Sequence, residues 1–244
     1  MELRCEEAAR LVWAAKWGTA AGALAIVSLM AWLSGGAAGL AAVAAGALLG
    51  VVALFKASKA WVRGCTPAEG RLAEVGEAVS KALGVKISTY YCPSELAFSA
   101  YVPGRGVLAF GDGAAELSRE EFWAVVWHEA AHIRERDTLV NFVLAFALGA
   151  SVVSSLILSP GNPPWPLALL LASGLLIAHA VAQEAYAHLY AAVVTGPAIV
   201  SAIEKTHKRQ PRRLLALLRR CLAKGGAPTA TTPLDATPSG ARRN

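Results

Sequence analysis

Four long stretches without Asp, Glu, Lys or Arg constrain this chain more than any other feature. They run from Trp17 to Leu33, from Leu40 to Phe55, from Leu139 to Leu158 and from Trp165 to Ala182. With its flanks, each stretch reaches the roughly 20 residues that a helix needs to cross a bilayer. Only 16% of the residues are charged, against about 25% in soluble domains. We therefore expect a multi-pass protein of the cell membrane, with four transmembrane helices in two hairpins.

The basic residues predict how these hairpins are oriented. The net charge is +6, and basic residues flank both ends of the first hairpin, whereas its central turn at Ser34-Gly35-Gly36 has none. Positively charged flanks stay in the cytoplasm, so we expect both ends of each hairpin to be cytoplasmic. The flanking residues are Arg4, Arg10, Lys16, Lys56, Lys59 and Arg63, and a basic run from Lys205 to Arg220 follows the fourth stretch. We expect these charges to face the lipid bilayer and predict no nucleic-acid partner. A signal peptide is the competing interpretation of the first stretch, but a second apolar stretch follows it directly.

The remaining sequence predicts an α-helical membrane protein with a small cytoplasmic α+β domain. We expect a helix that starts at Thr66-Pro67 and ends near Ala82 or Leu83, three strands, and a helix from Ser118 to Asp137. The strands are expected at Val85 to Tyr91, Leu96 to Val102 and Val107 to Phe110. The four cysteines show no metal-binding spacing and are expected to be reduced thiols. The expected parts are an N-terminal region with a hairpin (1–63), the α+β domain (64–138), a second hairpin (139–183), a cytoplasmic helical part (184–223) and a disordered tail (224–244).

The predicted helix from Ser118 to Asp137 contains the pattern H-E-x-x-H, formed by His128, Glu129 and His132. Residues one turn apart lie on one face of a helix, so both imidazoles can reach one metal ion. Imidazole ligands suit zinc, and the intervening glutamate can take a proton from a metal-bound water. The pattern therefore favours metal-dependent peptide hydrolysis. The alternative is an ordinary amphipathic helix that exposes His and Glu to solvent.

Glu184 is the candidate for a third ligand. The two histidines precede the third apolar stretch and Glu184 follows the fourth, so an antiparallel pair of helices returns the chain to the side that it left. Two histidines and one glutamate are the ligands of many catalytic zinc sites. The alternative is an interfacial carboxylate paired with a lysine. Asn141 and His179 lie inside apolar stretches, where polar groups are candidates for function.

In the order of its hairpins, its H-E-x-x-H pattern and Glu184, the chain resembles the HtpX-like and CAAX prenyl endopeptidase family of integral-membrane zinc metalloproteases, which are gluzincins. The resemblance covers the hairpins, Ala97-Phe98, the segment Leu117 to Glu121, the H-E-x-x-H pattern, Asp137 and the segments Glu184 to Ala187 and Gly196 to Ala198. It implies one Zn²⁺ per chain, bound by His128, His132 and Glu184, with Glu129 as the general base. It also implies that a polypeptide substrate pairs with an edge strand formed by Ala97, Phe98, Ser99, Ala100 and Tyr101.

Two positions depart from the family pattern. His188 stands where the family has an acidic residue that orients a ligand histidine, and Leu96 stands where it has asparagine. Asp137 or Glu135 could supply the missing carboxylate. His188, Tyr186 and Tyr190 are candidates for polarising the substrate carbonyl.

The resemblance implies a zinc endopeptidase that cleaves membrane or misfolded proteins at the cytoplasmic face, in protein quality control. Three alternatives stand beside it. They are a catalytically silent metal-binding membrane scaffold, a CAAX-type protease that processes C-termini, and a site-2-type intramembrane protease. Charged residues such as Glu120, Arg134 and Glu135 on the H-E-x-x-H helix argue against the last.

Overall fold

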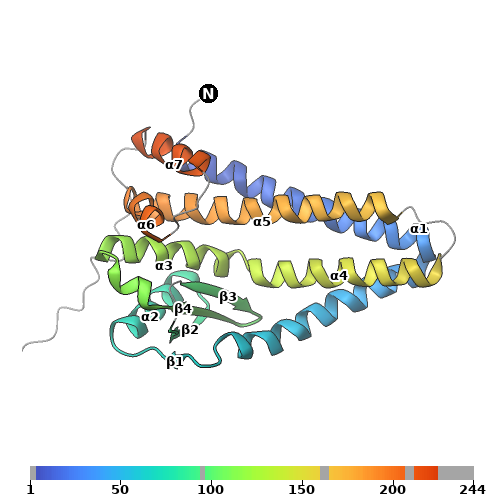
Figure 1. The fold of residues 1–244 in the computed structure, drawn as a ribbon, viewed down its shortest axis with the longest axis horizontal. Helices are drawn as coiled ribbons and strands as arrows, with labels where there is room; N and C mark the ends of the chain where they lie inside the picture. Colours follow the sequence, from blue (N-terminus) through green and yellow to red (C-terminus); the bar gives the residue numbers. More distant parts are fainter. Residues whose placement is uncertain (1–3, 94–96, 160–164, 207–211, 225–244) are drawn as a thin grey trace, which may run out of the picture.

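The computed structural model describes residues 4–93, 97–159, 165–206 and 212–224. It is mostly helical and carries one small sheet (Figure 1). Three helices are long and apolar enough to cross a membrane: α1 (Cys5–Trp61), α4 (Asp137–Leu158) and α5, whose candidate span is Pro166–Thr195 within Trp165–Thr195. The other helices are α2 (Arg71–Leu83), α3 (Arg119–Arg134), α6 (Ala198–Thr206), α7 (Arg212–Lys224) and a 3₁₀ turn, η1 (Asp112–Glu116).

Helix α1 is bent into two arms at Gly35 and Gly36, where the sequence predicts a turn (Figure 1). Gly36 has φ +54° and ψ −130°, a conformation that residues with a Cβ rarely adopt. The first arm packs on α5, where Gly22 meets Leu175, and the second packs on α4 through Gly46 and Gly50. Small residues at these positions let helices approach closely.

The sheet has the strand order β1-β2-β4-β3. Its strands are β1 (Thr66–Pro67), β2 (Lys86–Tyr91), β3 (Phe98–Val102) and β4 (Arg105–Phe110). β2 and β4 are parallel, and β3 pairs antiparallel with β4, so that β3 forms one edge of the sheet. The three expected strands are confirmed, and their ends differ from the expected ones by at most one or two residues. Leu96, the expected first residue of the second strand, lies outside the described residues.

Three sequence expectations are wrong in detail. Thr66-Pro67 forms the short strand β1, and the helix after it begins at Arg71. The H-E-x-x-H helix ends at Arg134, because Arg136 has φ +58° and the chain restarts as α4 at Asp137. α5 continues without a break to Thr195, so Glu184 lies in its interior. The expected disordered tail lies almost wholly outside the described residues.

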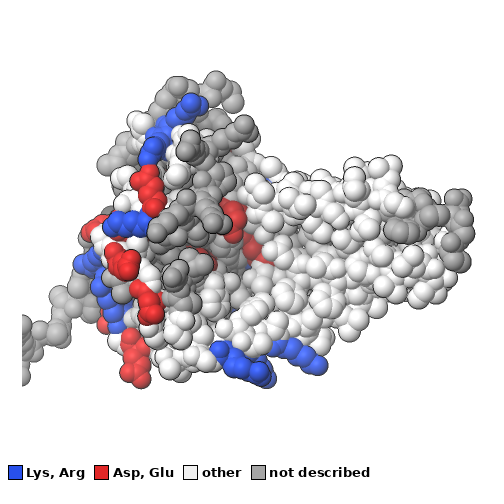
Figure 2. Space-filling model, in the orientation of Figure 1, with Lys and Arg blue, Asp and Glu red and all other residues white. Residues whose placement is uncertain are grey.

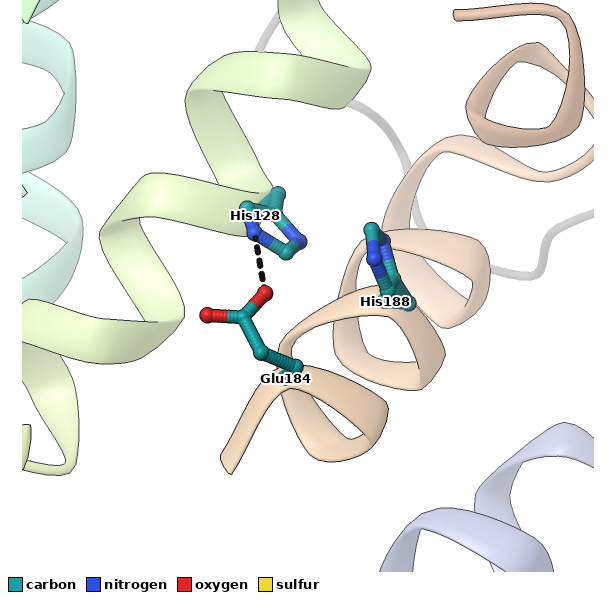
Figure 3. Close-up of side chains that lie close together, drawn as sticks. All are labelled: His128, Glu184 and His188. Atoms are coloured by element: carbon teal, nitrogen blue, oxygen red, sulfur yellow. Dashed lines mark ion pairs between the residues drawn. The ribbon is translucent and has the colours of Figure 1, made fainter. Parts of the chain in front are cut away.

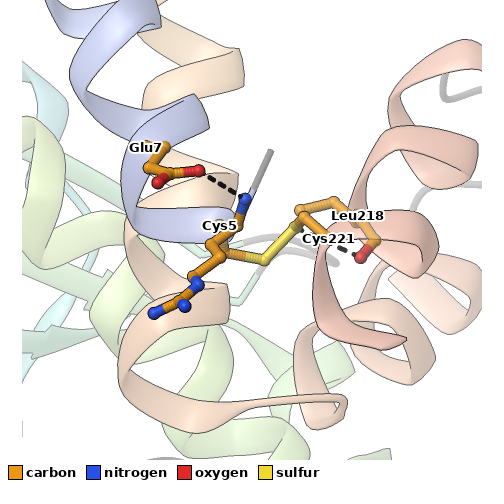
Figure 4. Close-up of a disulfide and its surroundings, with 5 residues drawn as sticks. Cys5, Glu7, Leu218 and Cys221 are labelled. Atoms are coloured by element: carbon orange, nitrogen blue, oxygen red, sulfur yellow. Dashed lines mark hydrogen bonds between the residues drawn. A yellow bond between two sulfur atoms is a disulfide. The ribbon is translucent and has the colours of Figure 1, made fainter. Parts of the chain in front are cut away.

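The cysteines are not reduced thiols. Cys5 is bonded to Cys221 and Cys65 to Cys92. The first disulfide joins the start of α1 to α7 near the other end of the described chain (Figure 4). Wide spacing in sequence concealed these pairs, because only the packing of α7 on α1 brings Cys221 beside Cys5.

The charged residues gather at the end of the molecule that carries the sheet, whereas the helices extending away from it show an uncharged surface (Figure 2). Helix α3 lies between the sheet and α5, and its residue Glu121 binds Lys205 Nζ of α6 at 2.7 Å. The hydrophobic core therefore joins α3, α5, α6 and the sheet into one support for the residues described next.

Candidate metal centre

Helix α3 places the two histidines of the H-E-x-x-H pattern on one face. A capping box starts this helix: Ser118 Oγ accepts from the Glu121 amide, and Glu121 Oε2 accepts from the Ser118 amide. One turn separates His128 from His132, and their Nε2 atoms lie 3.4 Å apart. The histidines therefore present one nitrogen each to a common point.

Helix α5 brings Glu184 to the same point. Its Oε2 lies 3.6 Å from His128 Nε2, and its Oε1 lies 3.6 Å from His132 Nε2. Figure 3 shows the Glu184 carboxylate facing His128 across the gap between α3 and α5. The return of the chain through α4 and α5 thus brings together the three residues that the sequence proposes as ligands.

These separations fit a metal ion. Bonds of about 2.0–2.2 Å in a tetrahedral zinc site place neighbouring ligand atoms roughly 3.3–3.6 Å apart. The observed separations are 3.4 Å between the two Nε2 atoms and 3.6 Å from each Nε2 to a different oxygen of Glu184, which is close to this range. The Glu184 side chain is 57% exposed, so one side of the cluster is open to water or to a substrate.

His188 belongs to the same cluster. It follows Glu184 by one helical turn, and its ring centroid lies 4.3 Å from that of His128. Ligand atoms of His128, Glu184 and His188 all lie within 4.8 Å of one another, so these three residues could also hold a metal ion. A neutral imidazole can bind zinc through one of its two ring nitrogens.

Asp137 orients His132. Its Oδ2 lies 2.8 Å from His132 Nδ1, which places the proton on Nδ1 and leaves Nε2 to face the other ligands. Burial lowers the pKa of His132, but the hydrogen bond to Asp137 and the charges of Glu129 and Glu184 raise it above its ordinary value overall. Asp137, at the corner between α3 and α4, thus supplies a carboxylate on the Nδ1 side of His132.

Glu129 lies next to the cluster in a dry environment. It is buried, and burial raises the pKa of its carboxyl group to about 7, against the lowering effect of His132 and of a hydrogen bond from Ser99. A carboxyl group with a pKa near neutrality can both accept and release a proton at physiological pH. This is the behaviour required of a general base.

A cavity of about 440 Å³ opens over the cluster. Glu129, Glu184 and both histidines of α3 line one part of it, and β3 contributes Phe98 and Ser99. The Tyr101 amide of β3 donates to Thr138 Oγ1 of α4 at 3.4 Å and so points away from β4. Backbone groups alternate in direction along an antiparallel strand, so the Ser99 amide and carbonyl also point away from β4, at the part of the edge that borders the cavity.

Several candidate residues lie elsewhere. Tyr186 points to the opposite side of α5, where its ring lies 5.4 Å from Lys16 Nζ, and Tyr190 stacks near Arg134. Neither is among the described residues that line the cavity. His179 is buried between Gln183 Nε2 and the Lys16 carbonyl, at 2.8 and 2.9 Å, and also lies away from the cluster.

Two contributors were not identified as such from the sequence. The Ser99 hydroxyl was expected to matter only as part of a strand, and Lys16 only as a flanking positive charge. A signal for Lys16 did exist, because it is the charge closest to the first apolar stretch and lies between two tryptophans, Trp13 and Trp17.

No family model, no curated protein and no solved structure matches this chain.

Proposed function

We propose that this chain is a membrane-embedded, zinc-dependent endopeptidase of the HtpX-like kind, which cleaves membrane or misfolded proteins in protein quality control. One observation carries the proposal: His128, His132 and Glu184 converge with the separations of a tetrahedral zinc site beside the buried carboxyl group of Glu129. The H-E-x-x-H pattern, the third ligand Glu184 and the general base Glu129 are thus adjacent.

Bound zinc would supply Lewis acidity and lower the pKa of a water molecule. Residues of the chain transfer the proton, orient the ligands and bind the substrate. Glu129 accepts the proton of the attacking water and passes it to the leaving amine, and the hydrogen bond from Ser99 holds its carboxylate in place. Asp137 keeps His132 in the ligating tautomer. The outward backbone groups of β3 at Ser99 offer an extended substrate the hydrogen bonds of an added strand.

For the topology, we propose four crossings, one by each arm of α1 and one each by α4 and α5. The basic flanks favour the cytoplasmic side for the sheet and the metal centre. The two disulfides lie at this same end of the molecule, and disulfides persist in the cytoplasm mainly in hyperthermophiles. The cytoplasmic assignment therefore implies a cytoplasm that tolerates protein disulfides. Labelling of a single cysteine introduced at Glu77, with the four native cysteines blocked, tests the side directly.

The test of hydrolysis uses the full-length protein in detergent with an unfolded membrane protein as substrate. We expect wild type with zinc to cleave, and Glu129→Gln to keep its zinc but to lose about 100-fold or more of the rate, the usual contribution of a general base. Glu120→Gln, an exposed change on the same helix, is the control and should cleave like wild type. Equal cleavage by Glu129→Gln and wild type would refute hydrolysis at this site.

The position of His188 favours a second candidate, a silent metal-binding scaffold. Structural zinc sites use four protein ligands, whereas catalytic sites keep one position open. If His188 joined His128, His132 and Glu184, the site would be closed. A His188→Ala variant separates the two: unchanged zinc affinity supports the open, catalytic site, and a large loss together with absent proteolysis in wild type supports the scaffold.

A further inference from the structure

Lys16 is buried at a place where a lysine is unexpected. It lies in the first arm of α1, next to the first apolar stretch, and its side chain is 0% exposed. Lysines near the ends of membrane helices normally extend their charge to the headgroups. Here the ammonium group turns inward instead, so its surroundings must compensate its charge.

Two carboxylates provide this compensation. Lys16 Nζ lies 2.5 Å from Asp137 Oδ1 and 3.6 Å from Glu135 Oε2. Both acids sit at the corner between α3 and α4, where the left-handed conformation of Arg136 turns the chain. The first membrane helix is therefore joined to the corner that immediately follows the H-E-x-x-H pattern.

Asp137 uses its two oxygens for two different partners. Oδ1 binds Lys16, and Oδ2 binds His132 Nδ1 at 2.8 Å. A continuous chain of contacts thus runs from Lys16 through Asp137 to His132, whose Nε2 faces Glu184. The Asp137 carboxylate is thus held from both sides, and the contact with Lys16 fixes the direction from which Oδ2 meets the imidazole.

The surroundings hold Lys16 in this position. Glu135 Oε2 accepts from Trp13 Nε1 at 2.9 Å and from Trp17 Nε1 at 3.3 Å. The Lys16 carbonyl is bound by His179 of α5. The Tyr186 ring lies 5.4 Å from Lys16 Nζ, within the range of a cation–π contact. Groups from α1, α5 and the α3–α4 corner therefore enclose the ammonium group.

We propose that Lys16 is a positioning residue for the metal ligand His132 and acts through Asp137. By pairing with Oδ1 and fixing the direction of the Asp137 side chain, Lys16 keeps Oδ2 on the Nδ1 side of the imidazole. Loss of such support from a ligand histidine typically lowers metal affinity by 10–100-fold. The inference rests on the metal centre proposed above, but it concerns a residue outside the ligand set.

The test measures Zn²⁺ affinity of the full-length protein in detergent, by competition with a chromophoric chelator. We expect Lys16→Met to weaken binding by about 10–100-fold and to change the absorption bands of bound Co²⁺, which report ligand geometry. Lys16→Arg, which retains the charge, should recover part of the affinity. Lys59→Met, an exposed change near the end of the second arm, is the matched control and should bind like wild type.

A double-mutant cycle shows whether Lys16 acts through Asp137. Asp137→Asn alone should weaken zinc binding, and adding Lys16→Met should weaken it no further, because the connection is already broken. The double variant also removes both members of the buried ion pair, so it can be compared with Asp137→Asn even if Lys16→Met alone fails to fold. Independent, additive losses would overturn the proposed route.

The outcomes for this link and for the metal centre are distinguishable. If wild type binds zinc and Lys16→Met binds it equally well, the inference about Lys16 is overturned while the metal centre stands. If wild type binds no zinc, the proposed function is overturned, and the positioning role is overturned with it.

Discussion

His128 of α3 and Glu184 of α5 face one another, and His128 Nε2 lies 3.6 Å from Glu184 Oε2, although all of α4 and the first part of α5 lie between them in the sequence. Only the antiparallel packing of α4 and α5 against α1 makes this contact possible. The geometry of the metal centre is therefore a direct consequence of how the long helices are arranged.

The contribution of Glu184 to metal binding can be measured by substitution. Glu184→Gln removes an anionic ligand while retaining the size of the side chain. We expect zinc affinity to fall by more than the roughly 10–100-fold that loss of an outer partner costs. Metal content after dialysis, determined by atomic emission, checks this. Glu77→Gln on α2, also exposed, should retain full occupancy; equal occupancy in the two variants would remove Glu184 from the ligand set.

The raised pKa of Glu129 predicts a pH-dependent stability of the metal-free protein. Its pKa is about 7 in the folded chain, against about 4.3 in an unfolded one, so folding favours the protonated carboxyl group. This contribution is complete below the unfolded pKa and is lost as the pH rises through about 7, at a cost of about 3 kcal/mol. Chelator-treated wild type should therefore lose more thermal stability between about pH 5 and pH 8 than Glu129→Gln does.

The difference between the two proteins is the informative quantity, because other groups that titrate in this range act on both. His132 contributes in the same direction, since its pKa is raised as well. Parallel melting curves for wild type and Glu129→Gln across this pH range would show that Glu129 is not held in a dry environment.

The disulfides predict that the protein as purified without reductant has no thiol that reacts before reduction, because all four cysteines are paired. The double variant Cys5→Ser/Cys221→Ser should lose about 2–5 kcal/mol of stability and release α7 from the start of α1. Thiol titration in denaturant and thermal unfolding check both expectations. Four reactive thiols in unreduced protein would contradict the pairing. A variant in which both Cys65 and Cys92 are substituted, and which therefore lacks the other disulfide, serves for comparison.

Helix packing predicts a large difference between two glycines. A Cβ at Gly46 would lie 2.5 Å from Ala150 Cβ and 2.7 Å from the Phe146 carbonyl oxygen, whereas a Cβ at Gly149 meets nothing within 4 Å. Gly46→Ala should therefore destabilise the protein by about 1–3 kcal/mol. Gly149→Ala should be neutral or stabilising by up to about 1 kcal/mol. Thermal unfolding in detergent compares them, and equal effects would argue against close contact of α1 with α4.

Local features were determined by the sequence itself. The apolar stretches can be read from composition alone. The turn at Gly35-Gly36, the capping box at Ser118 and the shared face of His128 and His132 depend on residues within about one or two turns of each other. Geometry over so short a range follows from the conformation of the local helix or turn. The direction of the chain through two hairpins also sufficed to nominate Glu184 as a ligand.

The tertiary structure alone decided the contacts between distant segments. From the sequence, Lys16 is expected to be a flanking charge and the cysteines to be isolated thiols. In the structure, packing buries Lys16 against Asp137 and brings Cys221 to Cys5. It also places the Asp137 carboxylate against His132 Nδ1. Such pairings depend on which faces of α1, α4, α5 and α7 meet, and side-chain packing across the whole molecule, rather than any local pattern, determines those faces.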